Sequence, residues 1–142
     1  MTEFIYSTLV KIGYTHPLHP ALVHFPMGMA MGALAFMIVL TWLNKTEIAP
    51  AAYYSHIFGL ITLLPTMIVG YMDWQHFYNG DPNPLIIVKI ILGFVLVALF
   101  SYAILLGRKG EVNTRKFLII SLLCFVVTCL IGFLGGELQY GS

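Results

Sequence analysis

Four long apolar segments, separated by short polar stretches, dominate the pattern of hydrophobic and polar positions along this chain. They cover about residues 20–43, 51–76, 84–107 and 115–135. Each has the roughly 20 residues that a helix needs to cross a bilayer. Proline occurs at or beside the expected start of three segments, at Pro20, Pro50 and Pro84, where a helix has no use for a backbone N–H. The pattern predicts an all-α integral membrane protein, a four-helix bundle with one domain over residues 1–142.

The composition supports a membrane protein. Of the 142 residues, 59% are hydrophobic and 9% are charged, whereas soluble domains have about 25% charged residues. Seven basic and six acidic side chains are too few to give a soluble domain its polar surface. The net charge is +1 and no basic patch is visible, so nothing in the sequence would hold the phosphates of a nucleic acid. We expect the chain to contact the lipid bilayer as a multi-pass protein.

The basic residues indicate the orientation of the bundle. Five of the seven lie in the loops after the first and third segments: Lys45, Arg108, Lys109, Arg115 and Lys116. The opposite side keeps only Lys11 and Lys89. Because positive charge is retained on the cytoplasmic side, both termini are expected to be extracytoplasmic.

Histidines and prolines are concentrated in residues 16–26, at the start of the first apolar segment. This stretch holds His16, His19 and His24, three of the five histidines. We expect Pro20 to be the first helical residue, His19 to cap the helix, and His24 to lie just over one turn inside. Ionisable groups in the apolar slab usually face the bundle interior or water. The sequence therefore favours His24 as a ligand, although a buried histidine satisfied by a backbone carbonyl or by Asp73 would give the same pattern.

The predicted topology brings further polar groups to the same side. Asp73 and His76 end the second segment, Lys89 lies about one turn into the third, and Glu137 follows the fourth. His56 is twenty residues before His76, about 30 Å along a helix. It has no visible partner at its own depth, and we expect it to be structural.

These groups suggest three functions. The first is a cytochrome-like electron-transfer subunit that binds haem b near the extracytoplasmic face and links quinone to a redox partner. His24 would be an axial ligand with His76 or His19 as its mate, Asp73 would orient a ligand, and Lys89 would pair with a haem propionate or simply extend to the interface. The second is a protein that binds or transports a divalent metal ion. The third is a structural or assembly subunit of a respiratory complex without its own cofactor. The ion in the second case would be held by residues from this set: His16, His19, His24, His76, Asp73 and Glu137.

Three motifs carry a family resemblance. Residues 19–26, 70–74 and 132–141 resemble the prokaryotic membrane-protein family called domain of unknown function 2231, and the likeness covers nearly the whole chain. Members of that family occur beside or fused to Rieske iron–sulfur domains and c-type cytochromes. The resemblance implies a membrane redox role, which favours haem, an extracytoplasmic redox partner and the inner membrane of a bacterium. Many relatives have a histidine early in the third helix, whereas residues 84–89 here contain none, so a ligand at that position would have to be replaced.

Overall fold

A computed structural model describes residues 2–140 of the chain, with side chains as far as Leu138. The described residues form five α-helices and two single 3-10 turns, with no strand. Four of the helices are long and apolar enough to cross a membrane, which confirms the predicted helical bundle. In chain order the elements are α1 (Thr2–Lys11), α2 (His19–Trp42), η1 (Thr46–Ile48), α3 (Ala49–Phe77), α4 (Pro84–Arg108), η2 (Glu111–Asn113) and α5 (Arg115–Tyr140).

Local sequence signals explain where the helices begin. Pro20, Pro50 and Pro84 lie in the first turns of α2, α3 and α4. Asn83 caps α4, because its side-chain oxygen accepts a hydrogen bond of 2.9 Å from the backbone N–H of Leu85. The prediction that His19 caps α2 is wrong: His19 is already helical, and the preceding residue makes no capping bond with its side chain. A residue of another helix supplies this cap, as described below.

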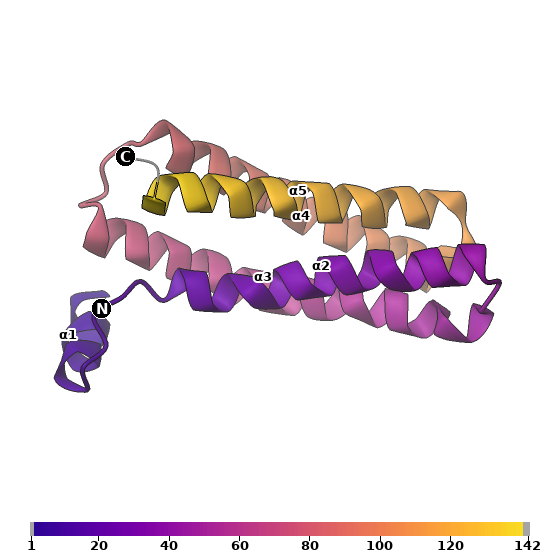
Figure 1. Cartoon of the computed structure of the whole chain (residues 1–142), viewed down its shortest axis with the longest axis horizontal. Helices are drawn as coiled ribbons and strands as arrows, with labels where there is room; N and C mark the ends of the chain where they lie inside the picture. The colour runs from indigo at the N-terminus through magenta and orange to yellow at the C-terminus, as the bar shows by residue number, and fades with distance from the viewer. Residues whose placement is uncertain (1, 141–142) are drawn as a thin grey trace.

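The four long helices run alternately up and down, each packed against its neighbours in the sequence, and α2 and α5 close the bundle (Figure 1). The first residues of α2 and α4 and the last residues of α3 and α5 therefore lie at one end, on the left in Figure 1. We call this the cavity end, for reasons given below, and the opposite end the basic end. Helix α1 is turned away from the bundle axis and contacts α3 at the cavity end (Figure 1).

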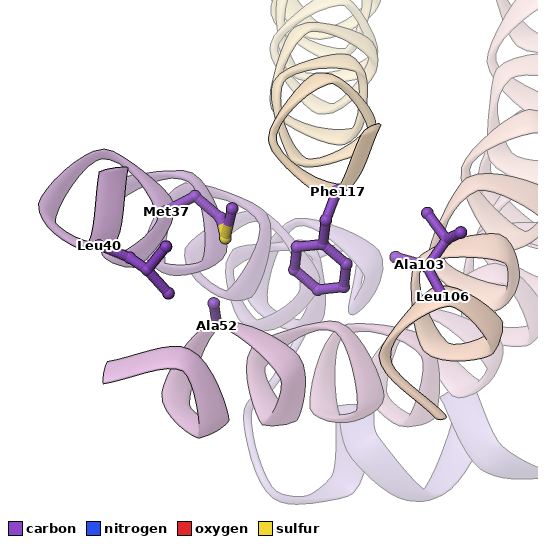
Figure 2. Packing of buried hydrophobic residues seen from close by; sticks show 6 residues of the cluster. All are labelled: Met37, Leu40, Ala52, Ala103, Leu106 and Phe117. Atoms are coloured by element: carbon purple, nitrogen blue, oxygen red, sulfur yellow. The ribbon is translucent and has the colours of Figure 1, made fainter. Parts of the chain in front are cut away.

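Buried apolar side chains fill the basic end and the middle of the bundle. At the basic end, the ring of Phe117 on α5 points between α2, α3 and α4, where it meets small and aliphatic side chains (Figure 2). A second cluster lies around Phe100 in the middle of the bundle. A Cβ added at Gly59 would lie 2.7 Å from the Phe100 ring, so glycine is required where α3 meets α4. The outward faces remain apolar, as expected of helices surrounded by lipid.

His56 has the partner that the sequence did not reveal. Its side chain is 0% exposed, and its Nε2 lies 2.9 Å from the Ser121 hydroxyl on α5. The rings of Phe100 and Phe117 pack edge-on against the imidazole. His56 therefore joins α3 to α5 inside the core, away from the other histidines.

Candidate functional site

A cavity of about 1090 Å³ lies between the four long helices at the cavity end. This volume is at the upper end of the range of roughly 300–1,000 Å³ that is typical of small-molecule sites. Its wall is mostly apolar and includes four glycines from α4 and α5. Nothing lies within 4 Å of a Cβ added at Gly136, whereas the ends of other side chains fill the space beside the other three. The polar and aromatic groups on the wall are few: His19, His24, Thr66, Tyr71, Asp73, Trp74, Tyr78, Lys89, Phe94 and Thr128.

His19 has a defined tautomer. Its Nδ1 lies 3.0 Å from the backbone carbonyl oxygen of Thr66 on α3. A carbonyl oxygen only accepts, so Nδ1 carries a proton, and in the neutral imidazole Nε2 then keeps its lone pair. The ring packs directly against Gly70, where an added Cβ would lie 2.7 Å from Nδ1. Within the described residues Nε2 has no hydrogen-bond partner, and His19 contributes to the cavity wall. This is the arrangement of an imidazole prepared to bind a metal centre.

Asp73 supplies the missing cap of α2. One carboxylate oxygen accepts a hydrogen bond of 2.7 Å from the backbone N–H of His19, and the other accepts one of 3.2 Å from Leu18. The second oxygen also accepts the phenol hydroxyl of Tyr6 on α1. The side chain is only 5% exposed. A carboxylate at a helix N-terminus satisfies free backbone donors and interacts favourably with the helix dipole. Asp73 thus holds the backbone of His19 and makes no hydrogen bond to its ring.

Lys89 enters the cavity from α4. A Cβ added at Gly135 on α5 would lie 3.4 Å from its Nζ, so the amine crosses toward that helix. In the part of the chain that the structure describes, no carboxylate lies within ion-pair distance of Lys89. An ammonium group in an apolar cavity favours a negatively charged partner. Lys89 is therefore the group most suited to hold an acidic ligand.

His24 also contributes to the cavity wall, although its side chain is exposed. It follows His19 by five residues on the same helix, so the two side chains point about 140° apart. They cannot readily approach one bound group from opposite faces.

The other predicted ligands lie outside the cavity. His76 stacks on Tyr6, with ring centroids 4.2 Å apart, and its Nδ1 lies 3.1 Å from Glu3 of α1. His16 packs edge-on against Tyr14, and Glu137 is exposed and does not line the wall. Among the described residues, no group of three or more histidine, cysteine or acidic side chains is arranged to hold a metal ion.

The sequence analysis missed two residues that help to hold His19 and Asp73 in place at the cavity end: Tyr6 and Thr66. Tyr6 is 3% exposed although it lies in a short helix outside the bundle. Burial, and then the hydrogen bond to the Asp73 carboxylate, raise the pKa of Tyr6 well above its usual value. Thr66 acts through its backbone carbonyl, for which no side-chain pattern gives a signal. Pro65 lies directly before it in α3, but a proline in a helix frees the carbonyl four residues earlier and gives no signal for Thr66.

Comparison with known families supports the expected resemblance. Residues 15–142 match a family described as predicted membrane protein (DUF2231). The chain belongs to this family. The match begins just after α1 and includes the residues that line the cavity, from Pro17 to Leu138. No curated protein and no solved structure matches the chain.

Proposed function

We propose that this chain is an electron-transfer subunit that binds b-type haem in the cavity and lies in the inner membrane of a bacterium. One observation supports haem above all: the Nδ1 proton of His19 is held by the Thr66 carbonyl, which leaves Nε2 free at the wall of a large apolar cavity. Metal-ligating histidines almost always donate their other ring N–H in this way. His19 thus replaces His24 as the preferred ligand, with His24 second.

The remaining groups of the cavity suit the other parts of a haem. Lys89 would neutralise a propionate, since its ammonium group has no carboxylate partner among the described residues. Gly136 lines the wall with nothing within 4 Å of an added Cβ, and the lack of a side chain there would let a flat macrocycle approach α5. When bound, haem would supply one-electron redox chemistry. This chain would bind the group, orient it and exclude water from it.

The expected orientation places the cavity end on the extracytoplasmic side of the membrane. Basic residues at the opposite end support this assignment. A cofactor at this depth would be close to a redox protein outside the membrane and also accessible to quinone in the bilayer. We therefore propose that the chain transfers electrons between quinone and an extracytoplasmic redox protein, as part of a larger respiratory complex or beside one.

Absorption spectroscopy tests the proposal. The full chain would be expressed with haem supplied, purified in mild detergent, and measured before and after dithionite. We expect a Soret band with reduced α and β bands in the wild type, lost in His19→Ala and kept in the control His16→Ala, which changes a histidine outside the cavity. His24→Ala tests the alternative ligand. A wild-type spectrum without haem bands, with metal analysis negative as well, would contradict the cofactor and favour a purely structural subunit.

A further inference from the structure

The cavity is open toward the surrounding lipid on one side. Five large apolar side chains contribute to its wall and are also exposed: Leu64, Ile68 and Tyr71 of α3, and Ile90 and Phe94 of α4. Ile68 and Phe94 are 62% and 63% exposed. Wall residues this exposed on two helices that pack against each other indicate an opening between α3 and α4. We call this opening the α3–α4 window.

The large apolar side chains of this kind all lie on α3 and α4. Helices α2 and α5 also have large exposed apolar side chains, such as Phe25 and Phe133, but none of those described contributes to the cavity wall, and the exposed wall residue of α2 is the polar His24. The window lies on helices that are expected to span the membrane. A molecule that passes through it would come from the hydrocarbon region of the bilayer and not from water.

The charge inside the cavity limits which molecule this can be. Lys89 is the basic side chain on the wall, and the Asp73 carboxylate already accepts hydrogen bonds from Tyr6 and from the start of α2. Asp73 is therefore engaged, and Lys89 favours another anion. A lipid-soluble molecule that satisfies both the apolar wall and Lys89 has an apolar body and an acidic group.

We infer that the cavity takes a carboxylate-bearing amphiphile from the bilayer through the α3–α4 window, with its carboxylate at Lys89. Haem, with two propionates on an apolar macrocycle, is one such molecule, and in that case the inference rests on the proposed function. A long-chain fatty acid has the same chemistry without the iron. The two sources are distinguished by the experiment below.

The window is tested by the rate of loading. Ile68→Trp with Ile90→Trp adds bulk at the rim, whereas Ile61→Trp with Ile91→Trp adds equal bulk on exposed positions of the same helices away from the wall. Each protein is placed in lipid nanodiscs and mixed with haem-loaded vesicles, and the Soret band is followed. We expect the rim pair to load about tenfold more slowly and the control pair within about twofold of wild type. Equal rates for the two pairs would overturn the window, and melting temperatures check that both variants are folded.

The acidic group is tested by paired ligands. We expect Lys89→Met to lower the affinity for haem at least about tenfold and the affinity for haem dimethyl ester by less than about twofold. Radiolabelled palmitate and its methyl ester form the second arm. If the wild type retains palmitate but not haem, and Lys89→Met no longer retains palmitate, this inference is supported and the proposed function is contradicted. Equal affinities of wild type for acid and ester, or retention of neither haem nor palmitate, would overturn it.

Discussion

The carboxylate of Asp73, near the end of α3, accepts a hydrogen bond of 2.7 Å from the backbone N–H of His19, the first residue of α2. This bond joins residues 54 positions apart in the chain. It caps one helix with the side chain of another and fixes the height of the His19 ring beside the Thr66 carbonyl. Stability at the cavity end and the geometry of the proposed site therefore depend on the same carboxylate.

Asp73→Asn should destabilise the protein and weaken ligand binding together. The amide keeps one acceptor oxygen and places an NH₂ donor against donors that the carboxylate now satisfies. We expect a loss of about 2 kcal/mol in unfolding free energy, the usual cost of unpaired buried donors. Thermal unfolding in detergent measures it, with the exposed Asp81→Asn as control. Equal melting of Asp73→Asn and wild type would show that the cap contributes little.

Gly70→Ala should displace the His19 ring while leaving the histidine itself unchanged. The added Cβ would lie 2.7 Å from Nδ1, so the ring must move away from the Thr66 carbonyl. Loss of such supporting contacts typically lowers metal affinity about 10–100-fold, and we expect a haem titration to show a decrease of this size. Gly28→Ala is the matched control, because nothing lies within 4 Å of an added Cβ there. Similar haem affinity of the two variants would contradict the role given to His19.

The contact of α1 with the bundle should be lost at high pH. The folded pKa of Tyr6 is raised by burial and by Asp73, so the neutral phenol is favoured when α1 is docked. The stabilisation is complete below the unfolded tyrosine pKa of about 10 and is lost as the pH rises through the higher folded value. Limited proteolysis of residues 12–18 between pH 8 and 12 should show this release. Tyr6→Phe, which keeps the stacking on His76 but loses the hydroxyl, should show faster cleavage already at pH 8; cleavage of the two proteins at the same rate at pH 8 would argue against the bond.

Ser121→Ala should destabilise the core and leave the cavity unchanged. The substitution removes the partner of the His56 Nε2, and His56 is fully buried. We expect a cost of about 1–3 kcal/mol for the unpaired buried group, measured by thermal unfolding, with haem affinity equal to that of wild type. Ser55→Ala is the control, since its hydroxyl bonds only to a carbonyl of its own helix. Altered haem affinity in Ser121→Ala would indicate coupling between the two halves of the bundle.

Cysteine labelling should establish the orientation. In a variant with Cys124 and Cys129 replaced, a cysteine at Asp81, between α3 and α4, should react with a membrane-impermeant maleimide added outside intact cells. A cysteine at Asn113, between α4 and α5, should react only after the cells are opened. Both positions are exposed. The opposite labelling pattern would reverse the orientation and place the cavity on the cytoplasmic side.

The sequence by itself determined the four long helices, because backbone groups in lipid must be satisfied within each segment and apolar stretches of this length have no alternative. It also placed His19, His24, Asp73 and Lys89 at one end of the bundle. Only the tertiary structure decided that these four side chains share a cavity while His16, His76 and Glu137 do not. A shift of one residue along a helix turns the side chain by about 100°. An apolar segment does not locate a helix to within one residue, so it does not fix which way a side chain points. Packing of α3 against the start of α2 sets that rotation, and the bonds of Asp73 that hold it join residues far apart in the chain.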